Sequence, residues 1–98
     1  SIQVGIAEGS NGLKGDKKAL LIEFSPERKG ILLKAEEFVG HPAEITLYAE
    51  NGKMVKSLSV PGLPDELFIS TAGLKRGIYF VRLSAKGRSL SAKLAVFN

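Results

Sequence analysis

Turn signals recur at short, regular intervals along this chain, and their spacing constrains its fold more than any other feature. Clusters of glycine, proline, asparagine and charged residues separate segments that begin roughly 8–12 residues apart. Within each segment apolar residues alternate with polar ones, which is the period of a strand with one buried face. Short alternating strands at this spacing are typical of antiparallel β-sandwiches. The sequence therefore predicts an all-β protein, an antiparallel β-sandwich of seven to eight strands.

Each expected strand ends at a recognisable turn. Asn51-Gly52 is the strongest short hairpin signal, and a type I′ turn there would require a positive φ at Gly52. Residues 65–76 are the one segment with a helical alternative. Because Ile69-Ser70-Thr71 favours a strand and Gly73 would weaken a helix by about 1 kcal/mol, we expect this segment to be extended. The expected strands cover residues 2–6, 19–24, 31–38, 45–49, 54–60, 67–70, 79–84 and 89–97.

The length of the chain predicts one domain. Ninety-eight residues suffice for a single hydrophobic core but not for two, so we expect one domain over residues 1–98. No apolar run approaches the roughly 18 residues that span a bilayer, so the chain is not expected to cross a membrane. The first residues lack the basic, apolar and small-residue layout of a signal peptide. Export would therefore have to be inherited from a longer precursor.

Basic residues are concentrated in the second half of the chain. Residues 1–49 hold six bases and seven acids, whereas residues 50–98 hold eight bases and three acids. A basic half of this kind can attract nucleic acid, anionic lipid or acidic polysaccharide. The alternative is a solvated face whose positive charges are balanced by acidic side chains nearby in three dimensions. Nucleic-acid binding would use basic residues interleaved with stacking aromatic rings. Arg82, which lies between Phe80 and Ser84 on one strand face, is an isolated example of this pattern. We therefore do not expect nucleic acid as a partner.

Side chains suited to catalysis are sparse. The single histidine, His41, precedes Pro42 in an expected loop, and no Gly-x-Ser-x-Gly elbow supplies a nucleophile for it. Glu36 and Glu37 are adjacent on an expected strand, so they would point to opposite faces and could not act as a pair. We expect no catalytic residue and no enzymatic activity in this domain.

The glycine-rich segment 9–16 is the candidate for a phosphate or metal loop. It lacks the Gly-Lys-Ser/Thr ending of a P-loop, and its oxygen ligands do not have the spacing of a calcium loop. A flexible connection accounts for it, with a weak calcium site at Asp16 and Asn11 as the alternative. Cysteine is absent, which excludes disulfides, thiol catalysis and zinc sites of the cysteine type. We expect no cofactor and no metal.

Aromatic residues suited to sugar binding are few. Tryptophan is absent, and Tyr48 and Tyr79 are the two tyrosines. Tyr79 alternates with the apolar residues of its strand and is expected in the core, whereas Tyr48 alternates away from Leu47 and is a candidate ligand contact. A single exposed ring makes a poor stacking platform, so the sequence leaves polysaccharide binding open without favouring it.

The second half of the chain carries a recognisable order of motifs. Residues 45–55 combine a strand, an Asn-Gly-Lys hairpin and a returning strand, and residues 74–81 have the spacing Leu-x-x-Gly-x-Tyr-x-Val. A turn at Gly87 and the stretch Lys93-Leu94-Ala95-Val96 follow. Over residues 43–98 this order resembles the C-terminal sorting domains of the type IX secretion system. It is also similar to the basic terminal domains of secreted fibre-degrading hydrolases.

The resemblance implies an immunoglobulin-like β-sandwich at the end of a larger exported protein. Its implied role is to direct a covalently linked catalytic or adhesive domain to the outer-membrane secretion machinery, so that the cargo is secreted or reaches the cell surface. The alternative function is a carbohydrate- or polyanion-binding module of a secreted hydrolase, with an acidic or plant polysaccharide as its ligand. Residues 1–24 match no part of the resemblance and would form an additional strand or a preceding linker.

Five residues are candidates for recognition by the sorting machinery. Gly52, Gly77 and Tyr79 belong to the motifs, but each also has an expected structural role. Gly52 would form the turn, Gly77 would allow a tight entry to the next strand, and Tyr79 would fill the core. Lys93 differs, because period two turns it away from its apolar neighbours and into solvent. Lys93, together with Arg82 on the neighbouring strand, is therefore the stronger candidate for an exposed recognition residue.

Overall fold

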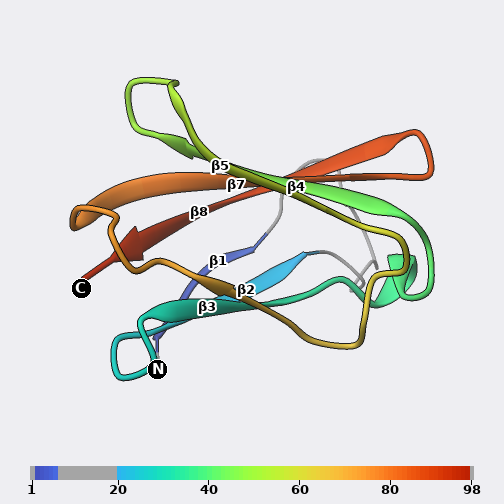
Figure 1. Ribbon diagram of the computed structural model, residues 1–98, viewed down its shortest axis with the longest axis horizontal. Coiled ribbons are helices and arrows are strands. Elements are labelled where there is room, and N and C mark those ends of the chain that lie inside the picture. Colours follow the sequence, from blue (N-terminus) through green and yellow to red (C-terminus); the bar gives the residue numbers. More distant parts are fainter. Residues whose placement is uncertain (1, 7–19, 98) are drawn as a thin grey trace.

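Eight strands and one short 3-10 helix make up the part of the chain that the computed structural model describes, residues 2–6 and 20–97 (Figure 1). The glycine-rich segment 9–16, with its calcium alternative at Asp16 and Asn11, lies outside these residues. None of the described residues belongs to a helix that is long and apolar enough to cross a bilayer. The elements are β1 (Ile2–Ile6), β2 (Leu21–Ser25), β3 (Gly30–Lys34), η1 (Glu36–Phe38), β4 (Ala43–Ala49), β5 (Met54–Val60), β6 (Leu67–Ser70), β7 (Gly77–Ala85) and β8 (Arg88–Val96).

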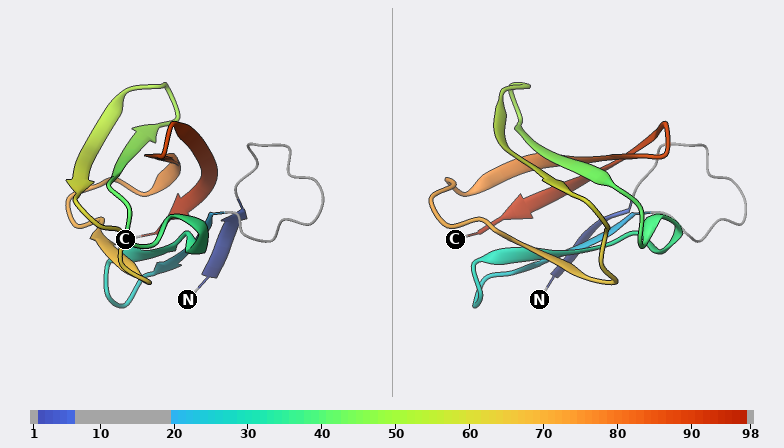
Figure 2. Two further views of the ribbon diagram at one scale, coloured as in Figure 1. Left: turned by 90° about the vertical axis from the view of Figure 1, so that its right-hand side faces the viewer. Right: turned by 45° about the vertical axis from the view of Figure 1, so that its right-hand side comes forward.

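The strands form two four-stranded antiparallel sheets that pack face to face (Figures 1 and 2). The first sheet has the order β1-β2-β3-β6 and the second has the order β5-β4-β7-β8. The chain crosses between the sheets after β3, β5 and β6. Such crossings are typical of Greek-key sandwiches. In immunoglobulin terms β2, β3 and β6 correspond to strands A, B and E, and β4, β7 and β8 correspond to C, F and G. The predicted immunoglobulin-like sandwich is confirmed.

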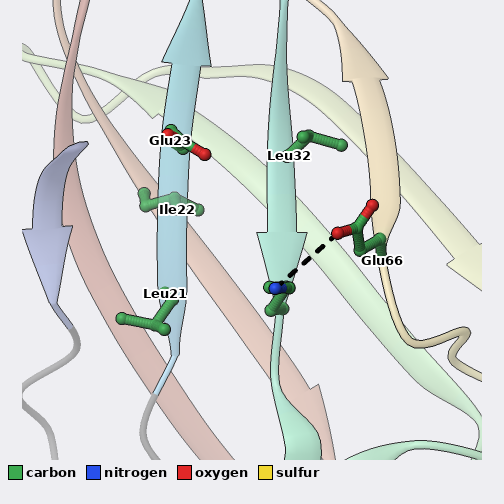
Figure 3. A pocket seen from close by; sticks show the side chains of 6 residues that line it. Leu21, Ile22, Glu23, Leu32 and Glu66 are labelled. Atoms are coloured by element: carbon green, nitrogen blue, oxygen red, sulfur yellow. Dashed lines mark ion pairs between the residues drawn. The ribbon is translucent and has the colours of Figure 1, made fainter. Parts of the chain in front are cut away.

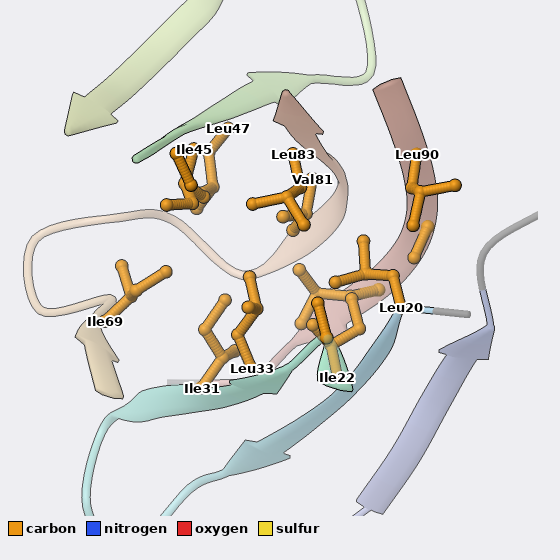
Figure 4. Packing of buried hydrophobic residues seen from close by; sticks show 14 of the residues in the cluster. Leu20, Ile22, Ile31, Leu33, Ile45, Leu47, Ile69, Val81, Leu83 and Leu90 are labelled. Atoms are coloured by element: carbon orange, nitrogen blue, oxygen red, sulfur yellow. The ribbon is translucent and has the colours of Figure 1, made fainter. Parts of the chain in front are cut away.

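The core fills the space between the sheets, because alternate residues of each strand point inward (Figure 4). Ile31 and Leu33 of the first sheet are fully buried, as are Leu47, Val81 and Leu83 of the second. Among the described residues every buried polar side-chain atom has a hydrogen-bond partner. The period-two pattern of the sequence is therefore the pattern of burial.

The expected strand over residues 31–38 is shorter than predicted. It ends at Lys34, and Glu36–Phe38 forms the 3-10 turn η1 instead. The chain leaves the first sheet here, and a compact turn lets Phe38 enter the core, where it is completely buried. The prediction that Glu36 and Glu37 point to opposite faces of a strand was therefore wrong. Glu37 instead pairs with Arg88, whose guanidinium lies 5.4 Å from the centre of the Phe38 ring.

The type I′ turn predicted at Asn51-Gly52 is also wrong in its type. Gly52 has the expected positive φ of 91°, but Asn51 does not share it. The Ala49 N–H donates to the Lys53 carbonyl oxygen at 2.8 Å, which closes a three-residue loop with the glycine at its left-handed position. Asn51 stabilises this loop through its Oδ1, which accepts a hydrogen bond from the Lys53 N–H at 2.9 Å.

Candidate functional site

Three of the predicted site residues meet on the outer face of the β5-β4-β7-β8 sheet. Tyr48 on β4, Arg82 on β7 and Lys93 on β8 alternate away from core residues, so all three point outward. Arg82 and Lys93 are exposed, and Tyr48 is half-buried. The predicted exposure of Lys93 is therefore confirmed.

The strand register aligns four of these outward side chains in one row. Met54 pairs with Tyr48, Tyr48 pairs with Phe80, and Phe80 pairs with Lys93. Directly opposed residues of antiparallel strands have Cβ atoms roughly 4.5–5.5 Å apart, so neighbours in this row are in reach of one another. Met54 is 56% exposed and Phe80 is 37% exposed. The row, Met54-Tyr48-Phe80-Lys93, thus presents a thioether, two aromatic rings and an ammonium group in that order.

Arg82 extends this row by one step along the strands. It pairs with Ser91, which places Arg82 and Lys93 on neighbouring strands as diagonal neighbours, roughly 7–8 Å apart at the Cα atoms. The Arg82 Nη2 donates to Ser89 Oγ at 3.4 Å. Small hydroxyl side chains lie on the same face, at Thr46, Ser57, Ser59, Ser84, Ser89 and Ser91. Glu44 also points outward here, where it pairs with Ser84 and adds an exposed carboxylate diagonal to Arg82. The face therefore presents two adjacent cations beside the aromatic pair, with one carboxylate next to Arg82.

The three motif residues lie elsewhere and shape the scaffold. Gly52 occupies the tip of the β4–β5 hairpin, and Gly77 opens β7 opposite Val96. Tyr79 is 7% exposed, as predicted for a core residue, and its hydroxyl donates to the Lys75 carbonyl oxygen at 2.7 Å. This arrangement is the tyrosine corner of immunoglobulin-like sandwiches, in which a tyrosine early in strand F bonds to the backbone a few residues upstream. The Gly-x-Tyr motif thus fixes the corner that precedes β7.

A shallow pocket on the outer face of the first sheet escaped the sequence analysis (Figure 3). Leu21 and Leu32 form its apolar part, and the ammonium of Lys34 lies 3.6 Å from the Glu66 carboxylate across it. The sequence signal for this pocket was period-two alternation. Leu32 and Lys34 alternate with the buried Ile31 and Leu33 and therefore point to the outer face. The cation in this pocket is already paired with a carboxylate.

Side chains that could bind a metal are not brought together in the described part of the chain. No group of three or more histidine, aspartate or glutamate side chains converges within residues 2–6 and 20–97. His41 lies in the connection between η1 and β4, where its backbone N–H donates to the Phe38 carbonyl oxygen at 3.0 Å.

Comparison with known proteins assigns the domain to a family. The sequence model of one family, described as the secretion system C-terminal sorting domain, matches residues 19–97. The match includes β2 and β3, which lie outside the stretch of residues 43–98 that carried the resemblance. No curated protein matches the chain. Domains of this kind are targeting modules of type IX secretion, and they mark proteins for secretion or for the cell surface. The chain belongs to the family of secretion system C-terminal sorting domains.

Proposed function

We propose that the secretion machinery recognises this domain through the outer face of the β5-β4-β7-β8 sheet, with Lys93 and Arg82 as the principal contacts. The observation that carries the proposal is their placement as exposed diagonal neighbours beside Phe80. The cargo would be a catalytic or adhesive domain linked covalently upstream, and the sorting domain itself would contribute no catalysis.

The position of the motif residues supports this choice of surface. A receptor at the outer membrane contacts what the folded domain displays, and Tyr79 is buried while Gly52 and Gly77 present no side chain. These residues can influence recognition only through the strands that they position. The tyrosine corner orders the entry to β7, which carries Phe80 and Arg82.

The chemistry of the row also suits a protein partner. Tyrosine and arginine are enriched among the residues that carry most of the energy at protein interfaces, where they are surrounded by contacts of little energy that exclude water. Here Tyr48 and Phe80 pair with each other, and Arg82 lies between a threonine and a serine on the neighbouring strands. Because all of them project from paired strands, little conformational entropy is lost when a partner binds.

Export of a reporter tests the proposal. A reporter would be fused upstream of the wild-type domain, of Lys93→Glu and of Lys93→Glu/Arg82→Glu, in a host with type IX machinery. We expect the wild-type fusion in the medium or at the cell surface and the double variant in the periplasm. A hydrogen bond to a charged group contributes roughly 1.5–3 kcal/mol, so the exported fraction should fall about tenfold or more.

The matched control for Lys93→Glu is Lys86→Glu, which makes the same change of charge at the β7–β8 turn, away from this face. Thermal unfolding of each variant separates lost recognition from lost folding, since surface substitutions usually change stability by no more than about 0.5 kcal/mol. Equal export of folded Lys93→Glu/Arg82→Glu and wild type would exclude this face. Failure of the wild-type domain, in a host where another sorting domain exports the same reporter, would exclude targeting by this chain.

A further inference from the structure

The connections between strands divide the charged residues of the sandwich between its two ends. Successive connections of antiparallel strands lie at alternate ends, so residues 26–29, 50–53 and 71–76 lie at the same end, with 71–76 between the other two (Figure 1 and the right-hand view of Figure 2). We call this the basic end, because its connections hold two carboxylates, Glu27 and Glu50, and five cations: Arg28, Lys29, Lys53, Lys75 and Arg76.

The opposite end has the reverse composition. Its described connections, residues 35–42, 61–66 and 86–87, hold one lysine and four carboxylates. The two ion pairs within residues 20–97, Lys34–Glu66 and Arg88–Glu37, also involve this end. No cation of the basic end forms an ion pair with another described residue. The ion pairs of the described residues therefore involve one end of the sandwich, and the cations of the basic end take part in none of them.

Backbone hydrogen bonds hold the basic end in place. The Thr71 N–H donates to the Lys29 carbonyl oxygen at 2.9 Å, which joins the β2–β3 turn to the connection before β7. Thr71 is fully buried, and the Tyr79 hydroxyl fixes the Lys75 carbonyl oxygen from the core. The cations of two connections are therefore anchored at their backbones, which lowers the entropy lost when they bind a ligand.

Lys29 lies at a turn position that glycine would occupy without strain. Its φ is 52°, in the left-handed region, which costs an L-residue other than glycine roughly 1–2 kcal/mol. Glycine would remove this strain, yet the position carries an exposed cation. The adjacent Arg28 lies over the Phe68 ring, with its guanidinium carbon 5.3 Å from the ring centre. Arg28 and Lys29 thus place two neighbouring exposed cations on one tight turn.

We infer that the basic end binds an acidic polysaccharide, a function separate from recognition by the secretion machinery. Cations on three separate connections suit a polymer with repeated carboxylate or sulfate groups, because several weak contacts then form at once. A nucleic acid is less suitable, because residues 26–29, 50–53 and 71–76 contain no aromatic side chain for stacking on bases. The turns at 26–29 and 50–53 also lack a large apolar side chain that could insert into a membrane.

Binding of the 98-residue chain to defined polymers tests the inference. The probes are heparin and polygalacturonate, with xylan as the neutral control, at about 50 and about 200 mM salt, where charge-driven binding weakens steeply. The test variant is Lys75→Gln/Arg76→Gln, and the control is Lys86→Glu, which lowers the net charge by the same amount at the opposite end. The double variant should lower the slope of log affinity against log salt by about two, one for each cation removed. Lys86→Glu should leave this slope unchanged.

Four outcomes would overturn the inference. No binding of either acidic polymer at the lower salt would exclude the site, and equal weakening by both variants would indicate general charge attraction. Binding of duplex DNA as tight as that of heparin would indicate a general polyanion surface. Tighter binding to vesicles of anionic phospholipid would indicate a membrane as the partner. Because Lys93 and Arg82 are intact in every variant, the export assay and this assay can fail independently.

Discussion

The two hairpins of the second sheet differ in regularity, although they share a sheet and a similar sequence pattern. Strands β7 and β8 pair residue by residue over their full nine-residue lengths, and a two-residue turn joins them. Strands β4 and β5 have an irregularity in register between Leu47 and Tyr48, and a three-residue loop joins them. The inward residues of β8 are buried, whereas those of β5 are only half-buried.

The neighbours of the two outer strands account for this difference. The inner face of β8 packs against β1 and β2 of the other sheet. Strand β5 lies at the open side, where Lys56 points inward and its Nζ donates to the Ser70 carbonyl oxygen of β6 at 2.8 Å. An inward charge and a bulge are features that discourage an edge strand from pairing with other chains. The place of a hairpin in the sandwich, more than its turn sequence, therefore determines its regularity.

The largest effect should come from truncating the core of each hairpin. Leu83 on β7 is completely buried, so Leu83→Ala leaves a cavity and should cost about 2–5 kcal/mol of the free energy of unfolding. Leu58 on β5 is half-buried, and Leu58→Ala should cost less than half as much because part of its surface already contacts water. Chemical denaturation of both variants measures the two losses. Equal losses would show that β5 contributes as much to the core as β7.

A smaller effect should come from the loop of the less regular hairpin. Gly52 has a φ of 91° and open space where a Cβ atom would stand, so Gly52→Val should lose at least roughly 1–2 kcal/mol through backbone strain alone. Gly52→Asn is the matched control, because asparagine tolerates the left-handed region and should lose less. The unfolding midpoints report both losses. An unchanged midpoint for Gly52→Val would contradict the loop geometry, and an equal loss for Gly52→Asn would point to packing rather than strain.

Alternation along the sequence was enough to place most of the sandwich. In β7 and β8 it separated buried Tyr79 and Leu83 from exposed Arg82 and Lys93, because a strand turns successive side chains to opposite faces. Alternation breaks at the 3-10 turn η1, since Phe38 is three residues after the inward-pointing Ala35 and is therefore out of phase with it. The turn that ends β3 depends on the crossing to the second sheet, which is a property of the tertiary fold.

The candidate surfaces needed information that a single strand does not contain. Sequence analysis identified Tyr48, Arg82 and Lys93 separately, but only the pairing of β4 with β7 and β7 with β8 placed them around Phe80. The basic second half is likewise divided in space, because Lys75 and Arg76 lie at the basic end, Arg82 and Lys93 lie on the outer face, and Lys86 and Arg88 lie at the opposite end. Net charge along the chain could not separate these groups, since the separation follows from which end of the sandwich each connection occupies.

The smallest effect should come from the turn of the regular hairpin, and it should be stabilising. Lys86 and Gly87 have φ values of 54° and 73°, so the type I′ turn lies here, with lysine at a position where asparagine is preferred. Lys86→Asn should raise the free energy of unfolding by about 0.5–1 kcal/mol, part of the roughly 1–2 kcal/mol that the left-handed region costs. Lys86→Ala removes the same charge but keeps the strain, so its unfolding midpoint should stay close to that of the wild type. If Lys86→Ala stabilised the domain as much as Lys86→Asn, repulsion between cations rather than backbone strain would limit this hairpin.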